Sequence, residues 1–343
     1  MGKKFRLGLI GCGRIGIVHA AAAQAVPSAE IVRVVDVFAE AAEKLGKEYG
    51  VPYSTNHHDI LDDPEIDGVL ICSSTDTHAQ FITESAEAGK QIFCEKPIHN
   101  DIAEIDKALT AVEKAGVKLM VGFQRRFDPN FKAAQEAIAA GKIGDVHIVK
   151  ITSRDPAPPP ISYIKVSGGI FIDMSIHDFD MARFLTGSEV EEVYAVGAVR
   201  IDPEIGEAGD VDTAVMTLKF ENGAIAIIDN SRQAVYGYDQ RIEVFGSKGM
   251  VDVDNNFPNN HRLHTADAIS SEKPLHFFLE RYMEAYSAEI QVFVESVVND
   301  TDVPVSGIDG RWPVLIGEAA WKSVRENRPV TIAEIQEGHS GNS

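Results

Sequence analysis

Phe5-Arg6-Leu7-Gly8-Leu9-Ile10-Gly11-Cys12-Gly13-Arg14-Ile15-Gly16 is the stretch that decides the fold, because a strand-like apolar run leads directly into a G-x-G-x-x-G loop. A helical run of small residues, His19 to Ala25, follows the loop, and Asp36 ends the next strand-like run. The loop alone is a weak signal. Placed between a strand and a helix, with an acid about twenty residues further on, it predicts a dinucleotide-binding Rossmann fold.

Each glycine of the loop has its own expected task. Gly11 permits the tight turn, Gly13 lets the backbone approach a pyrophosphate, and Gly16 lets the helix pack on the sheet. The helix that begins with Arg14 and Ile15 offers backbone N–H groups to the phosphates. The alternative is that the loop is only a structural turn.

Asp36 decides which dinucleotide is expected. Its carboxylate would accept hydrogen bonds from a ribose diol and repel a 2′-phosphate. The following residues, Val37-Phe38-Ala39, supply no positive charge. We therefore expect NAD rather than NADP, with a helix-capping role for Asp36 as the alternative.

The first 124 residues alternate strands and helices, which predicts a parallel sheet with right-handed crossovers. The expected strands are 5–10, 31–35, 68–72, 91–94 and 117–123, and the expected helices are 39–49, 77–88 and 101–115.

Two further loops follow strands of this sheet, at the edge where ligands bind in such folds. In the first, Ser73, Thr75 and His78 are candidates for contacts with the cofactor, although the hydroxyls are equally suited to cap a helix. In the second, Glu95 and Lys96 precede a proline. A lysine there would stabilise a developing alkoxide, whereas the alternative is a surface ion pair with Glu95.

The second domain is expected over 125–332 and the last residues, 333–343, as a frayed tail. Successive strands without helices between them predict a largely antiparallel sheet, a broad surface suited to oligomer contacts. The expected strands are 146–154, 190–199, 212–220, 223–230, 240–245 and 249–253, and the expected helices are 127–140, 278–298 and 309–327.

The segment 168–180 carries the chemistry expected of this domain. Asp173, His177 and Asp180 stand at i, i+4 and i+7, so a continuous helix would place them on one face. Carboxylates beside an imidazole orient it and hold its pKa near neutrality, which suits proton transfer. A surface helix with a polar face is the alternative.

Composition excludes several classes of partner. The formal charge of -20 argues against nucleic acid and anionic membranes, and no apolar stretch is long enough to span a bilayer. Cys12, Cys72 and Cys94 lie in or beside apolar runs, which indicates reduced, buried thiols in a cytoplasmic protein. The pairs His57-His58 and His261/His264 lack Cys or acidic residues at ligand spacing, so no metal is expected.

Together, the fingerprint, Glu95-Lys96-Pro97 and the segment 168–180 resemble the Gfo/Idh/MocA oxidoreductases, over about residues 5–330. Further similar stretches are 121–128, 153–156, 236–241 and 281–286. The resemblance implies a Rossmann domain, a C-terminal α/β domain with a large open sheet, a homotetramer, and a Lys96–Pro97 bond that can be cis.

The same resemblance implies roles for individual residues. Lys96, Asp173 and His177 match the family's catalytic residues, and Asp180 matches a ligand of a substrate hydroxyl. Arg126 lies where relatives contact substrate or cofactor. Asp155 falls near a position that is Asn in some relatives, and Tyr236 or Tyr238 would line the pocket.

The implied activity is NAD-dependent oxidation of a secondary alcohol of a cyclitol, with myo-inositol as the first candidate and 2-keto-myo-inositol as its product. Two alternatives stay open. One is the same chemistry on scyllo-inositol, another inositol isomer or an aldose. The other is an NAD-binding sensor without catalysis.

Overall fold

The computed structural model describes residues 4–340, and the chain divides into two compact units. Unit 1 comprises Met1–Asp128 and Met283–Val314, and unit 2 comprises Pro129–Tyr282 and Leu315–Ser343. The sequence predicts one boundary after residue 124, whereas the chain in the structure returns to unit 1 for Met283–Val314.

Unit 1 is built on a six-stranded parallel sheet with the order β3-β2-β1-β4-β5-β6. Its strands are β1 (Phe5–Ile10), β2 (Ala29–Val35), β3 (Tyr53–Ser54), β4 (Gly68–Ile71), β5 (Gln91–Glu95) and β6 (Leu119–Gly122). The central strands are buried on both faces, and Val69, Leu70 and Phe93 have no exposed surface. This explains why these strands read as continuous apolar runs rather than as alternating patterns.

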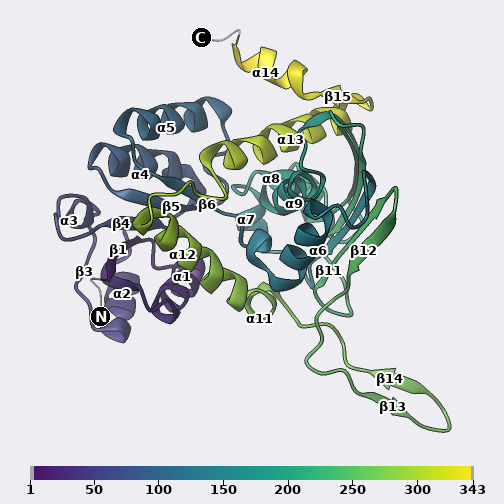
Figure 1. Ribbon diagram of the computed structural model, residues 1–343, viewed down its shortest axis with the longest axis horizontal. Helices are drawn as coiled ribbons and strands as arrows, with labels where there is room; N and C mark the ends of the chain where they lie inside the picture. Colours follow the sequence, from purple (N-terminus) through teal and green to yellow (C-terminus); the bar gives the residue numbers. More distant parts are fainter. Residues whose placement is uncertain (1–3, 341–343) are drawn as a thin grey trace. The chain divides into compact units, whose positions relative to one another are not determined.

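Helices cover both faces of this sheet. Figure 1 shows α4 and α5 on one face and α1 and α12 on the other. The helices of unit 1 are α1 (Arg14–Ala25), α2 (Ala39–Tyr49), α3 (His58–Leu61), α4 (Thr75–Glu87), α5 (Ile102–Ala115), the 3₁₀ turn η1 (Gln124–Phe127), α12 (Met283–Val298) and the first part of α13 (Gly307–Glu326). The doubly wound parallel sheet predicted from the alternating pattern is therefore confirmed.

Unit 2 contains a seven-stranded sheet with the order β12-β11-β7-β10-β9-β8-β15. Its strands are β7 (Val146–Arg154), β8 (Val190–Ala198), β9 (Thr213–Phe220), β10 (Ile225–Ser231), β11 (Asp239–Gly246), β12 (Gly249–Val253) and β15 (Val330–Thr331). All neighbours pair antiparallel except β10 and β7, which are parallel. The predicted mostly antiparallel sheet is confirmed, with one parallel pair at its centre.

One face of this sheet packs against helices, and the side chains on the other face point outward. In β9, for example, Ala214, Met216 and Leu218 are buried, whereas Val215 between them is 49% exposed. The helices of unit 2 are α6 (Pro129–Ala139), α7 (Ile161–Ile164), α8 (Gly169–Asp173), α9 (Ile176–Thr186), α10 (Pro203–Glu207), α11 (Phe278–Arg281), the remainder of α13 and α14 (Ile332–Ser340).

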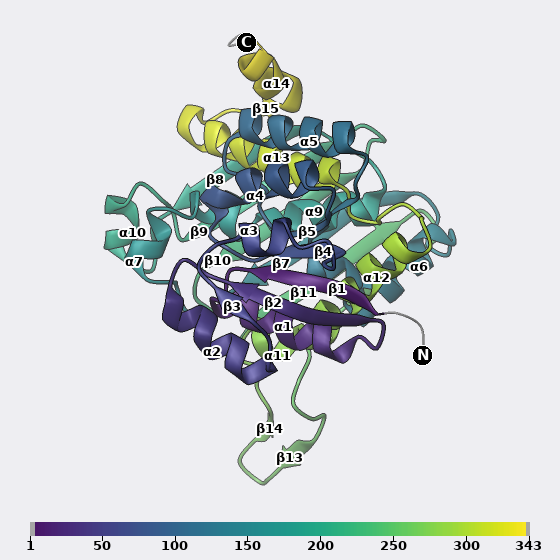
Figure 2. The ribbon, with the colours of Figure 1, turned by 90° about the vertical axis from the view of Figure 1, so that its left-hand side faces the viewer.

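A small hairpin belongs to unit 2 but is separate from its main sheet. Its strands, β13 (Arg262–His264) and β14 (Ile269–Ser271), project away from that sheet in both Figure 1 and Figure 2. Strands this short and exposed have no buried face, so no alternating pattern marks them in the sequence.

Two expectations are wrong in unit 2. Residues 333–340 do not fray, because they form most of α14, while 341–343 lie outside the described residues. The expected single helix over 168–180 is two helices, α8 and α9, that meet at Met174 and Ser175. Within residues 4–340, no helix is long and apolar enough to cross a membrane.

Candidate active site

The glycine loop of unit 1 has the geometry that a pyrophosphate requires. Gly11 has a φ of 98°, and a Cβ on it would lie 2.5 Å from the backbone of Cys72 and Ser73. A Cβ on Gly16 would lie 1.9 Å from the carbonyl oxygen of Gly11, whereas Gly13 faces open space. Gly13 is the N-cap residue of α1 and has no side chain of its own to cap the helix, so the start of α1 lies beside this open space. The residues therefore fit a dinucleotide phosphate.

Asp36 lies directly after β2 at the same edge. Its Oδ2 accepts the Cys12 N–H at 2.6 Å, and its Oδ1 accepts the Phe38 N–H at 2.8 Å. The neighbouring Val37 and Phe38 are 78% and 74% exposed. The carboxylate is thus fixed beside the glycine loop, next to an apolar surface, as binding of an unphosphorylated ribose requires.

The thiol beside this loop is unreactive. Burial, together with the charge of Asp36, raises the pKa of Cys12 to about 12. Cys72 and Cys94 are also buried and free, with pKa values raised by burial. The prediction of three buried, unpaired thiols is confirmed, and none of them is a nucleophile at neutral pH.

His78 joins the two loops that follow β4 and β5. Its Nδ1 lies 2.8 Å from the carbonyl oxygen of Pro97, and its Nε2 lies 3.0 Å from that of Ser73. Ser73 Oγ in turn lies 2.7 Å from the Thr77 hydroxyl. The buried ring of His78 thus connects the loop after β4 to the loop after β5, and it holds in place the backbone next to Lys96. The Lys96–Pro97 bond is cis, as the resemblance predicts.

Behind Lys96 lies a buried cluster of ionisable groups. Glu95 Oε1 lies 2.5 Å from His19 Nε2, and its Oε2 accepts the backbone N–H of Lys96 at 3.1 Å. Glu289 of α12 is fully buried beside them, and neither of its carboxyl oxygens has a hydrogen-bond partner among residues 4–340. Burial, reinforced by the charge of Glu95, raises the pKa of Glu289 well above its usual value, which favours the protonated form of this acid.

Arg126, the other unit 1 residue with an expected ligand contact, makes contacts within its own unit. Its Nη2 lies 3.0 Å from Asp309 Oδ1, and its Nη1 donates to the carbonyl oxygen of Pro304 at 3.3 Å. Asp309 also accepts the N–H of Ser306 at the start of α13. The arginine thus links the turn after β6 to the start of that helix.

In unit 2, a buried arginine holds Asp173 in place. Arg232, 1% exposed, places Nη1 3.2 Å from Asp173 Oδ2 and Nη2 3.5 Å from Asp210 Oδ2. The Tyr163 hydroxyl donates to the other oxygen of Asp173 at 2.9 Å. Asp210, whose pKa burial raises, accepts the N–H of Ile170 at the start of α8 at 2.9 Å. The helix and its terminal carboxylate are therefore oriented as one assembly.

The break between α8 and α9 is also pinned. Ser175 donates to Asn230 Oδ1 at 2.5 Å, and Asn230 Nδ2 donates to Asp178 Oδ2 at 2.8 Å. His177 is half-buried two residues after the serine, and Asp180 is 1% exposed. His177 and Asp180 therefore lie on the same helix, α9, whereas Asp173 is the last residue of α8.

Asp155 and Tyr236 lie at the edge of the unit 2 sheet where β7 and β10 end. The backbone N–H of Asp155 donates to the carbonyl oxygen of Ser231 at 2.9 Å, and its backbone carbonyl oxygen accepts the N–H of Ala234 at 2.6 Å. The Tyr236 hydroxyl donates to Asp239 at 2.5 Å and accepts from Arg154 at 3.1 Å. Tyr238, the other candidate, is buried against Phe277 and Tyr282. Of the two tyrosines, Tyr236 is the more exposed.

Two family models match consecutive parts of the chain. Residues 5–123 match the oxidoreductase family with an NAD-binding Rossmann fold, and residues 131–252 match the GFO/IDH/MocA C-terminal domain. The chain belongs to the Gfo/Idh/MocA oxidoreductase family. Unit 1 therefore carries the NAD-binding domain of this family, as the glycine loop and Asp36 predict.

Relatives cover almost the whole chain. Inositol 2-dehydrogenase from Rhizobium meliloti is 50% identical over 329 residues, which cover 96% of this chain and 99% of the relative. Myo-inositol 2-dehydrogenase from Thermotoga maritima is 48% identical over 331 residues, with 96% and 99% covered. Scyllo-inositol dehydrogenase from Lactobacillus casei, solved with NAD(H) and scyllo-inositol, is 32% identical with a TM-score of 0.90, covering 96% of this chain and all of that one.

Sequence reasoning missed the buried ionisable groups that surround the expected site residues. Arg232, Glu289 and His19 each follow or interrupt an apolar run, which is the only local signal of their burial. Their partners lie far away in the chain, so no spacing rule connects them.

Removing the negative charge at position 36 is predicted to weaken NAD binding. Asp36→Ser should raise the dissociation constant for NAD by roughly tenfold, because that factor is ~1.4 kcal/mol, about the value of one hydrogen bond to a charged group. Binding of NADP should weaken less or improve. Fluorescence titration with both cofactors measures this, with Asp302→Ser on the exposed surface as control. An unchanged ratio of the two affinities would contradict the assignment.

Glu289→Gln is predicted to stabilise the protein at high pH only. A carboxyl group with a raised pKa in the folded state loses stability as the pH rises above its unfolded value, and glutamine has no such loss. The gain in melting temperature should be negligible near pH 5 and clearly larger near pH 8, since each ~1 kcal/mol raises the melting temperature of a 343-residue chain by about 1–2 °C. Thermal unfolding at both pH values tests this, with exposed Glu284→Gln as control. An equal gain at both would refute a neutral Glu289.

Proposed function

We propose that this protein oxidises a secondary alcohol of a cyclitol with NAD, and that myo-inositol is its substrate and 2-keto-myo-inositol its product. The observation that carries the proposal is the 50% identity, over nearly the full chain, to an inositol 2-dehydrogenase. The fixed Asp36 carboxylate and the open face of Gly13 support NAD as the acceptor.

In this proposal, His177 removes the proton of the reacting hydroxyl as general base. Tyr163 and Arg232 hold the carboxylate of Asp173 in place, and this carboxylate orients and tunes the base. Lys96 stabilises the alkoxide-like oxygen and relays its proton. NAD held at the unit 1 edge would supply the hydride acceptor.

Recognition of a polyol requires several polar partners. We assign Arg126, Asp155, Asp180 and Tyr236 to the substrate hydroxyls, and we assign the loop residues at the unit 1 edge to the cofactor. The latter are Gly11, Gly13, Arg14, Ile15, Gly16, Asp36, Ser73, Thr75, His78, Glu95, Lys96 and Arg126. A buried partner left without its hydroxyl rejects the wrong isomer, because an unpaired polar group costs free energy.

Turnover with a panel of substrates tests the function. Purified protein with NAD should form NADH fastest with myo-inositol, more slowly with scyllo-inositol, chiro-inositol and glucose, and slowly or not at all with NADP. The relative solved with scyllo-inositol makes that isomer the second candidate. A faster rate on another polyol would make that polyol the substrate. NAD binding without any turnover would favour a non-catalytic, NAD-binding sensor.

Lys96→Ala is predicted to lower kcat by several orders of magnitude, because the variant loses charge stabilisation and the proton relay. The affinity for NAD should change far less, because Lys96 is only one of the residues assigned to the cofactor. Stopped-flow or steady-state rates with saturating myo-inositol measure this, and Lys44→Ala on the exposed face of α2 is the control. Near-normal turnover in the Lys96 variant would remove this residue from the mechanism.

We also propose a homotetramer that uses the outward face of the unit 2 sheet. Val196, Val215 and Ile227 are 53%, 49% and 40% exposed on neighbouring strands, and an apolar surface of this kind favours association.

Light scattering should give a mass near four times the 37.3 kDa of the chain. Val215→Lys should reduce the mass by placing a charge at the centre of this face, whereas Thr217→Ser on the same face should not. A wild-type mass of one chain would contradict the proposal.

A further inference from the structure

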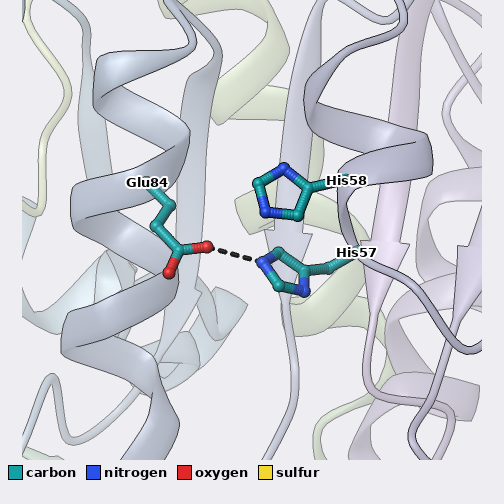
Figure 3. Close-up of side chains that lie close together, drawn as sticks. All are labelled: His57, His58 and Glu84. Atoms are coloured by element: carbon teal, nitrogen blue, oxygen red, sulfur yellow. Dashed lines mark hydrogen bonds and ion pairs between the residues drawn. The ribbon is translucent and has the colours of Figure 1, made fainter.

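A second group of chemically distinctive side chains lies in unit 1, on α3 and α4. His57 and His58 come from the start of α3, and Glu84 comes from α4 (Figure 3). One ligand atom from each residue lies within 4.8 Å of the others. His57 Nε2 is 2.5 Å from Glu84 Oε2, and the two imidazole rings lie 4.5 Å apart, on the same side of the carboxylate.

Further side chains orient these three. Gln80 donates to Glu84 Oε1 at 2.8 Å, which leaves Oε2 directed at the histidines. Asp62 lies 3.8 Å from His58 Nδ1, on the side of the ring away from its Nε2. The ring of Phe81 packs against His57 with centroids 4.9 Å apart. Carboxylates and amides behind the ligands are the usual second layer of metal sites.

An ion pair between His57 and Glu84 does not account for the whole arrangement. Such a pair uses only one histidine, yet the ring of His58 packs beside that of His57 at a tilt of 36°, and its side chain is 54% exposed. Asp59, Asp62 and Asp63 follow within the same short segment, and the chain as a whole carries -20. Two imidazoles and one carboxylate in an acidic, partly open setting favour a divalent cation with nitrogen preference.

This cluster is separate from the cofactor edge of unit 1. Glu84 lies nine residues after Thr75, where α4 begins, so it is ~13 Å along the helix from the Ser73–Thr75 loop. Glu84 is 28% exposed at its side chain and His57 is 24% exposed, so an ion can reach them from solvent.

We propose that His57, His58 and Glu84 form a zinc site that fastens α3 to α4. Three protein ligands and one water satisfy the tetrahedral preference of Zn²⁺. Binding of the ion would release to solvent the proton that lies between His57 Nε2 and Glu84 Oε2, and His58 would supply the third ligand. The sequence predicts no metal here, because no Cys or acidic residue stands near His57 and His58 at ligand spacing. The fold nevertheless brings an acidic ligand to them: Glu84 of α4, 26 residues after His58.

Calorimetry with tag-free, chelator-treated full-length protein and zinc chloride tests the site. Wild type should bind one Zn²⁺ per chain with micromolar affinity, and its melting temperature should rise with zinc because the ion binds the folded state. His58→Gln and Glu84→Gln should each weaken binding by at least about tenfold. His264→Gln, an exposed histidine of β13, is the matched control and should bind as wild type does.

Cobalt provides a second readout that does not depend on heat. With Co²⁺, wild type and the His264 variant should show the visible absorption of a four-coordinate site, and the His58 variant should not. Because the His58 side chain is 54% exposed, we expect the His58 variant to fold as wild type does. The absence of saturable binding, or binding that is equal in wild type and the His58 and Glu84 variants, would overturn the proposal.

Discussion

The close approach between α1 and the turn after β1 is the constraint on which the rest of the structure depends. A Cβ at Gly16 would lie 1.9 Å from the Gly11 carbonyl, so only glycine lets the helix begin where it does. This contact aims the end of α1 at the carboxyl edge of the parallel sheet. The same edge receives the ends of β2, β4 and β5, and with them Asp36, the Ser73 loop and Lys96. One steric requirement thus positions the cofactor residues.

A buried pair of ionisable side chains supports the expected chemistry in each unit. Glu95 is held by His19 beneath Lys96 in unit 1, and Asp173 is held by Arg232 in unit 2. Burying such groups costs free energy, and the cost rises sharply when one partner is removed. Neither pair is therefore explained by stability alone. Each fixes the direction of a polar group that the proposed reaction uses.

The sequence predicts the parts of this structure that depend on local pattern. Apolar runs separated by helical segments give the sheet of unit 1, and the glycine spacing gives the loop. What the sequence misses depends on distant contacts. The helix expected from Asp173 to Asp180 breaks because Ser175 and Asn230 of β10 hold its middle. Glu289 lies beside Glu95, almost two hundred residues away in the chain, and no sequence periodicity indicates such a contact. The helical tail α14 was missed because its last turns are polar and contain glycine.

The most direct test of the proposed reaction follows one hydrogen atom. Myo-inositol carrying deuterium at C2 is incubated with the protein and NAD, and the reduced cofactor is analysed by mass spectrometry. Direct transfer from C2 predicts deuterium in the nicotinamide ring and a slower rate than with unlabelled substrate. Unlabelled NADH, with the deuterium retained in the ketone, would show that another carbon is oxidised and would contradict the account.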